Sequence, residues 1–82
     1  MIIRSQDKRI ITTDMNLEIY HDERDKVFEI SNGAVGIIGV YSTEEKAIKV
    51  LDMIYEQYQT SIHNCKVFQM PQDNEVNWML VN

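Results

Sequence analysis

The side chains best suited to chemistry in this sequence are basic residues near its two ends. Arg4, Lys8 and Arg9 lie close together near the N-terminus, and Lys66 lies in an apolar run near the C-terminus. If these two segments were neighbouring strands, the cations would converge at one end of a sheet. Arginine forks bind phosphate oxygens through paired hydrogen bonds, so such a cluster is typical of a site for a small phosphorylated ligand.

Polar and aromatic residues beside these cations could complete such a site. Serine and glutamine side chains would supply hydrogen bonds, and an aromatic ring would stack against a base. The candidate ligand-binding residues are therefore Arg4, Ser5, Gln6, Lys8, Arg9, Lys66, Phe68, Gln69 and Trp78. The alternative is that the cations only neutralise carboxylates of an acidic chain, whose formal net charge is −5.

Catalytic signatures are weak in comparison. His63 and Cys65 would share one face of a strand, but a buried structural thiol is a more common role for such a cysteine than catalysis. Of the thirteen acidic residues, Asp22, Glu23 and Asp25 lie in a charged loop at residues 21–26, and Glu44 and Glu45 lie at the start of a helix. Neither context raises the pKa of a carboxyl group toward that of a general acid. We therefore expect no enzymatic activity, no catalytic residue, no metal site and no cofactor.

The elements that must position these residues are one helix and a set of short strands. Residues 42–59 predict the helix, because Ser42 and Glu45 have the spacing of a capping box and apolar residues follow at helical spacing. The apolar stripe comprises Ala47, Leu51, Ile54 and Tyr58, widened by Ile48, Val50 and Tyr55. The polar face comprises Lys46, Lys49, Asp52, Glu56 and Gln57.

The strands are predicted from β-favouring runs that are bounded by turn residues. Residues 32–33 are Asn-Gly, the dipeptide most typical of a type I′ hairpin turn. With that turn Ile30 faces Val35, and Phe28 faces Ile37. The predicted strands are residues 2–4, 9–12, 17–20, 27–31, 34–41 and 65–70.

These elements predict an α+β fold of a single domain over residues 1–82. It consists of an antiparallel β-sheet with one amphipathic helix packed on one face, in the order ββββ(β)αβ. The expected core comprises Phe28, Ile30, Val35, Ile37, Leu51, Ile54 and Phe68. Gly33, Gly36 and Gly39 lack the spacing of a dinucleotide-binding loop, so we interpret them as a turn glycine and two positions of bulge or close helix approach.

Composition restricts the partners further. Hydrophobic residues make up 44% of the chain, which is ordinary for a globular protein, whereas the acidic balance argues against nucleic-acid polymers and anionic membranes. The start of the chain lacks the apolar core of a signal peptide, and the single cysteine excludes an internal disulfide, so we expect a cytoplasmic protein. The apolar run at residues 78–81 needs cover from its own sheet or from another subunit, and we expect a homo-oligomer, most simply a dimer.

Several segments resemble a family of small proteins from phages and mobile elements of Firmicutes. They are residues 1–8 (MIIRSQDK), 40–47 (VYSTEEKA), 50–54 (VLDMI) and 67–72 (VFQMPQ), which together span roughly half of the chain. The chain differs from that family in its short helix-to-strand connection and in its apolar ending. The family has no catalytic assignment to transfer.

The resemblance implies a small acidic phage protein that acts by stoichiometric binding in the host cytoplasm. Two targets recur for counter-defence proteins of this kind. The first is a nucleotide immune signal, a small cyclic or ADP-ribose-type nucleotide, which an oligomeric sponge sequesters without catalysis. The alternative is a host protein, which is inhibited or regulated by direct binding, and an accessory role is also open. A basic, aromatic pocket would favour the sponge, and an exposed apolar patch without such a pocket would favour the protein partner.

Overall fold

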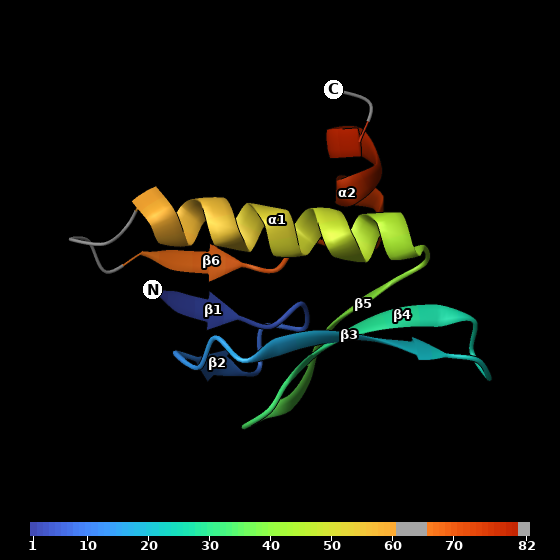
Figure 1. Cartoon of the computed structure of the whole chain (residues 1–82), viewed down its shortest axis with the longest axis horizontal. Coiled ribbons are helices and arrows are strands. Elements are labelled where there is room, and N and C mark those ends of the chain that lie inside the picture. The colour runs from blue at the N-terminus through green and yellow to red at the C-terminus, as the bar shows by residue number, and fades with distance from the viewer. Residues whose placement is uncertain (61–65, 81–82) are drawn as a thin grey trace.

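The computed structural model describes residues 1–60 and 66–80, and in the last stretch it describes side chains as far as residue 76 (Figure 1). In chain order, five short strands are followed by a long helix, a sixth strand and a second helix. They are β1 (Ile2–Arg4), β2 (Ile11–Thr12), β3 (Leu17–Asp22), β4 (Val27–Asn32), β5 (Gly36–Tyr41), α1 (Glu44–Thr60), β6 (Val67–Gln69) and α2 (Asp73–Leu80).

The strands form two three-stranded sheets. In the first sheet β1 is central, antiparallel to β2 and parallel to β6. In the second sheet β3, β4 and β5 form an antiparallel meander, and α1 packs against all three of its strands (Figure 1). The predicted α+β class is confirmed. The parallel pair arises because α1 runs back between β5 and β6, so that β6 enters the sheet in the same direction as β1.

The start of α1 differs in detail from the predicted capping box. The N-cap is Thr43, whose hydroxyl accepts a hydrogen bond from Lys46 N at 3.1 Å and whose carbonyl accepts one from Ala47 N at 3.2 Å. Ser42 instead donates its backbone N–H to Asp73 Oδ1 at 2.8 Å. The prediction of Ser42 as the cap is wrong by one residue, because Ser42 is recruited to hold the second helix.

The helix α2 is not among the elements predicted from the sequence. Gln72 caps it: the carbonyl of Gln72 accepts hydrogen bonds from Glu75 N at 3.1 Å and Val76 N at 3.3 Å. The Glu75 carboxylate accepts the Gln72 backbone N–H at 2.8 Å in return. This is the glutamate half of a capping box; the Gln72 side chain does not cap the helix but donates to the carbonyl of Gln6 at 2.9 Å.

Lys46 fastens α2 to α1. Only 5% of Lys46 is exposed, and its Nζ donates to Asp73 Oδ2 at 2.9 Å and to Ser42 Oγ at 3.0 Å. Its assignment to the polar face is wrong, because the ion pair and the hydroxyl compensate the burial of the ammonium group. Burial by itself would raise the pKa of Asp73, but the hydrogen bonds from Ser42 and Lys46 outweigh it and hold that pKa below its ordinary value.

The β4–β5 turn is not the predicted two-residue turn. The side-chain oxygen of Asn32 accepts hydrogen bonds from Ala34 N at 2.8 Å and Val35 N at 3.1 Å, and Asn32 pairs with Gly36 across the hairpin. The loop therefore comprises the residues between them. Gly36 has a φ of 90°, a conformation that glycine adopts without strain.

The longer loop changes which residues of β5 face the helix. It places Ile37 opposite Ser31, and a β-bulge between Ile30 and Ser31 then pairs Ile30 with Gly39. Ile38 is buried, with 2% exposed, whereas Val35 and Ile37 are 39% and 49% exposed. The predicted core positions at Val35 and Ile37 are wrong, because one extra residue in the loop moves them to the opposite face of the sheet.

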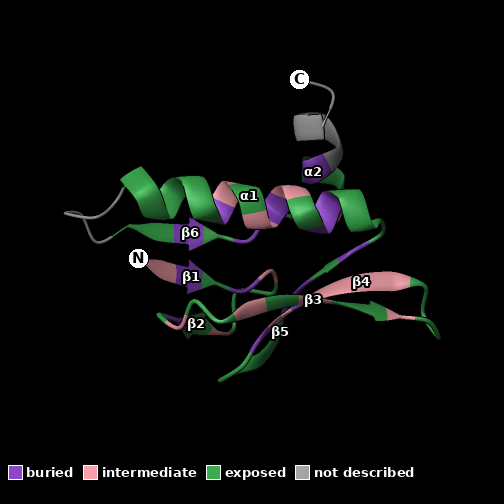
Figure 2. Ribbon diagram, in the orientation of Figure 1, coloured by how far each residue is buried: buried purple, intermediate pink, exposed green. Residues whose placement is uncertain are grey.

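The core lies between α1 and the strands, where the buried residues gather in Figure 2. Of the predicted core, Ile30, Ile54 and Phe68 are buried, and Phe28 and Leu51 are half-buried against it. The buried apolar residues are Ile3, Ile30, Ile38, Tyr41, Ala47, Val50, Ile54, Phe68, Met70 and Val76.

Candidate functional site

The predicted basic cluster is only partly assembled. The first and last strands pair as the hypothesis required, with Arg4 opposite Gln69. Because the pair is parallel, Lys66 lies at the far end of β6, where its carbonyl accepts the N–H of Ile2 at 2.9 Å. The structure brings Gln69 to Arg4 but does not bring Lys66 there.

The remaining cations lie on the open turn between β1 and β2. Arg4, Lys8 and Arg9 are all exposed, and Arg4 Nε donates to the carbonyl of Lys8 at 3.3 Å. Asp7 lies among them, and hydrogen bonds from the Ser5 hydroxyl and from Arg9 N lower its pKa. A carboxylate that stays ionised within the cluster would repel a phosphate group.

The polar candidates beside the turn are occupied by structural contacts. Ser5 is 2% exposed; its hydroxyl donates to Asp7 Oδ1 at 2.6 Å and accepts from Ile10 N at 3.0 Å. Gln69 Nε2 donates to the carbonyls of Ser5 at 2.9 Å and Met70 at 3.0 Å. Phe68 is part of the core, and the side chain of Trp78, on α2, lies outside the described residues.

Gln6 joins the two sheets. Its backbone N–H donates to the carbonyl of Ile38 at 2.8 Å. Its side-chain oxygen accepts from Val40 N at 2.8 Å, and its side-chain nitrogen donates to the carbonyls of Val40 and Pro71, each at 3.1 Å. The amide group thus pairs with the β5 edge as a strand residue would, and its donors and acceptors are used within the chain.

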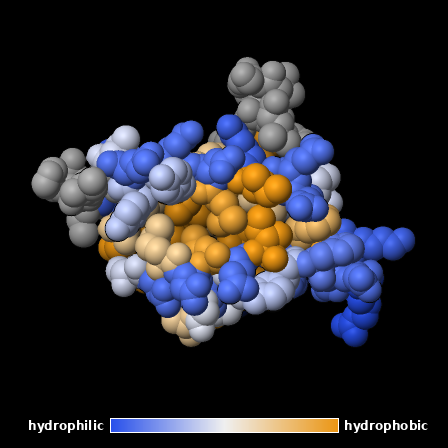
Figure 3. Space-filling model, in the orientation of Figure 1, coloured by the Kyte–Doolittle hydropathy of each residue, from blue (hydrophilic) through white to orange (hydrophobic). Residues whose placement is uncertain are grey.

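A second candidate site is an apolar groove between α1 and the start of β3. Its volume is about 370 Å³. We call it the α1–β3 groove, and its lining residues are Met15, Leu17, Leu51, Ile54, Tyr55 and Tyr58. In Figure 3 apolar surface is gathered in the hollow between α1 and the strands, rimmed by polar residues.

The groove exists because the rest of the chain covers only part of the apolar face of α1. Ala47, Val50 and Ile54 are buried. Tyr55 and Tyr58, predicted as a widening and an end of the same stripe, are 63% and 50% exposed. Tyrosine combines an apolar ring with a polar tip and is enriched at protein interfaces for that reason.

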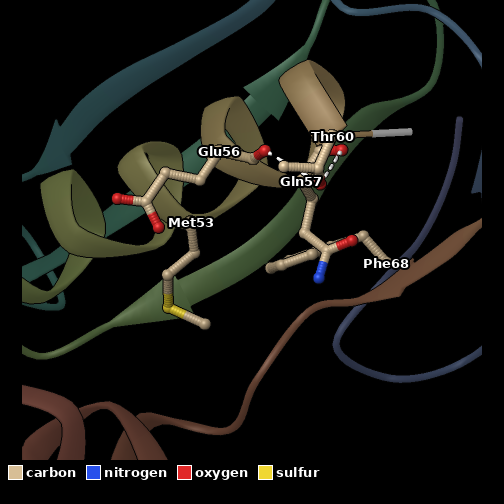
Figure 4. Close-up of a pocket in the computed structure, with 5 residues that line it drawn as sticks. All are labelled: Met53, Glu56, Gln57, Thr60 and Phe68. Atoms are coloured by element: carbon tan, nitrogen blue, oxygen red, sulfur yellow. Dashed lines mark hydrogen bonds between the residues drawn. The ribbon is translucent and has the colours of Figure 1, made fainter. Parts of the chain in front are cut away.

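A further hollow of about 330 Å³ lies on the other side of α1. Figure 4 shows Met53, Glu56, Gln57 and Thr60 of α1 facing Phe68 of β6. The Thr60 hydroxyl is turned inward to the carbonyls of Glu56 and Gln57, at 3.3 and 3.2 Å. The charged group at this hollow is a carboxylate, which does not suit an anionic ligand.

Two of the predicted ligand residues, Ser5 and Gln6, touch a smaller hollow of about 130 Å³, lined by the turn and by β5. Ser5, Gln6 and Asp7 contribute to its wall. Small-molecule sites in proteins usually enclose about 300–1,000 Å³. None of these three hollows is lined by arginine or lysine.

Comparison of the chain with protein-family models, with curated proteins and with solved structures finds no match. Over residues 1–60 and 66–80, no helix combines the length and the apolar character needed to cross a membrane. Within the same ranges no group of histidine, cysteine, aspartate and glutamate side chains is arranged to hold a metal ion.

Proposed function

We propose that this protein acts by stoichiometric binding to another protein through the α1–β3 groove. The observation that carries the proposal is an open, tyrosine-walled apolar groove in a chain whose described hollows have no basic lining. A groove of this kind suits an apolar protein segment better than a phosphorylated small molecule.

The exposed surface of the groove is large enough to matter energetically. With about 200 Å² per tyrosine side chain, Tyr55 and Tyr58 together leave roughly 200 Å² of ring surface in contact with solvent. Met15, which is 36% exposed, extends that surface toward the strands. Apolar patches of a few hundred Å² on small soluble proteins are commonly binding sites.

The resemblance of several segments to small phage proteins supports a host protein as the partner, which would be inhibited or regulated when the groove is filled. The absence of nucleophile and general-acid signatures in the sequence is compatible with action by binding alone. The complex is then expected to form without turnover of either component.

Capture of a nucleotide signal is the second candidate. It is favoured by the exposure of Arg4, Lys8 and Arg9 on a single turn. This candidate needs self-association, most simply a two-fold dimer, to enclose the phosphates and to supply the stacking surface. Arg4→Ala should then weaken binding of cyclic dinucleotides or ADP-ribose-type signals about ten- to a hundredfold.

The test compares Tyr55→Glu with Ile11→Glu, because Ile11 is similarly exposed (65%) and lies outside the groove. Tagged protein is used to capture partners from host lysate, and the dissociation constant of the partner identified is then measured by calorimetry. Loss of an aromatic anchor costs about 2 kcal/mol or more, about thirtyfold in affinity. We expect that loss for Tyr55→Glu and little change for Ile11→Glu.

Two results would contradict the proposal. Unchanged partner affinity in Tyr55→Glu would remove the groove from the function. Nucleotide binding that depends on Arg4, with no protein captured, would establish the second candidate in its place. Circular dichroism of each variant checks that the fold is retained.

A further inference from the structure

β3 is an edge strand whose outer side is unpaired in the described part of the chain. Just before β3, Asn16 O accepts a hydrogen bond from Gly33 N at 3.1 Å, so residues 16, 18, 20 and 22 are those whose backbone groups point toward β4. In an antiparallel ladder such residues alternate with residues whose N–H and C=O point away from the partner strand. The outward-pointing set is therefore Leu17, Ile19 and His21.

This edge opens onto the α1–β3 groove. Leu17 lines the groove, and Leu17 and Ile19 are packed against the core on the face that α1 covers. A further strand added beside β3 would alternate its side chains between the two faces of the sheet. One half of its side chains would enter the groove toward Leu51 and Tyr55, which makes apolar residues the suitable occupants there.

The other face of β3 is acidic. Glu18 and Asp22 are on it, with Tyr20 between them donating a hydrogen bond to Glu18 Oε2 at 2.5 Å. Opposite charges on directly neighbouring strands are stabilising, and like charges are destabilising. A second copy of β3 would place carboxylates against carboxylates in the registers that pair Glu18 with Asp22 or with itself, whereas a basic strand would find opposite charges in any register.

We propose that the occupant is an extended segment of a partner protein in which apolar residues alternate with lysine or arginine, added as a strand to the free edge of β3. The backbone groups of Leu17, Ile19 and His21 supply the main-chain hydrogen bonds. The groove takes the apolar side chains, and Glu18 and Asp22 pair with the basic ones. This inference rests on the proposed function, since it names the partner chemistry of the same groove.

The probe is an eight-residue peptide of alternating isoleucine and lysine with blocked ends, titrated into the full chain. Binding is followed by calorimetry and by the amide NMR signals of Leu17, Ile19 and His21. Matched controls are the same peptide N-methylated at every second amide, a peptide with glutamate in place of lysine, and a helical peptide of the same composition. N-methylation on the side facing β3 and glutamate substitution should each weaken binding about tenfold or more.

A charge reversal gives an independent check. Glu18→Lys should weaken binding of the lysine peptide and strengthen binding of the glutamate peptide. Ile11→Glu should alter neither, because Ile11 lies on β2 in the other sheet.

Strand addition is overturned if the helical peptide binds as tightly as the extended one, if N-methylation has no effect, or if no peptide shifts the three β3 amides. These results leave the proposed function to its own test. If Tyr55→Glu still abolishes capture of the partner protein, the groove binds that protein in another conformation. If Tyr55→Glu also leaves capture intact, the proposed function fails as well.

Discussion

Replacing Gln6 by alanine should destabilise the fold, because its side chain connects the two sheets by hydrogen bonds and is not available to bind a ligand. The substitution removes three side-chain hydrogen bonds, two with Val40 and one with the carbonyl of Pro71. Each contributes about 0.5–1.5 kcal/mol, and water can replace part of the exposed ones, so the expected loss is about 2 kcal/mol. In a domain of this size that corresponds to a fall in Tm of about 8–16 °C.

Urea unfolding followed by circular dichroism measures this loss directly. Gln59→Ala is the matched control, since Gln59 is an exposed glutamine near the end of α1. It should be neutral or slightly stabilising, because alanine has the higher helix propensity. If Gln6→Ala lowers the free energy of unfolding by less than about 0.5 kcal/mol, the Gln6 side chain does not stabilise the contact between the sheets, and Gln6 is again a candidate ligand residue.

Three further predictions concern stability. Ile54→Ala should cost about 2–5 kcal/mol in urea unfolding, as buried truncations do, because only 2% of Ile54 is exposed. Gly39→Ala should cost about 1–3 kcal/mol, since the added Cβ would lie 2.8 Å from the Cε atom of Met70; a neutral result would mean that Met70 moves freely. The pKa of Asp73 is lowered in the folded state, so its contribution is present above about pH 4 and is lost as pH falls through the folded pKa. Asp73→Asn should therefore be less stable than the wild type at pH 7, and the difference should shrink at about pH 3.

Local sequence rules predicted the elements that depend on short-range chemistry. The apolar spacing after Thr43 predicts α1 to within two residues of its ends, and the strand bounds follow the β-favouring runs. The interpretation of Gly39 as a bulge position is also confirmed, because it pairs with Ile30 where the register shifts. An added Cβ there would meet Met70 and Tyr41, neither of which is on a helix, so the alternative of a close helix approach is wrong for Gly39.

The features that were missed depend on contacts between distant segments. Asn32, which donates to the carbonyl of Asp14, caps a loop one residue longer than the predicted turn, and that loop decides that Ile38 and not Ile37 is buried. The burial of Lys46 requires Asp73 from the far end of the chain. No periodicity within one segment contains this information.

The same reason separates the two candidate sites. Ser5, Gln6 and Gln69 were predicted as ligand residues from their type, but type does not reveal whether a polar side chain serves a ligand or the backbone of another strand. The α1–β3 groove was missed because Met15 and Leu17 meet α1 only in the folded chain. The sequence signal that pointed toward it was an apolar arc on α1 too wide for one sheet.

The pairing of β1 with β6 has a consequence for how the protein emerges from the ribosome. β1 is synthesised well before α1, yet its parallel partner begins at Val67, after α1 has been made. Long-range pairing of this kind closes a large loop before any contact rewards it, which slows folding. Ile3, fully buried in the finished sheet, therefore stays without its neighbour Phe68 until nearly the whole described chain has been translated. The β3–β4–β5 meander and α1 are synthesised earlier, so they can fold before β6 is available to pair with β1.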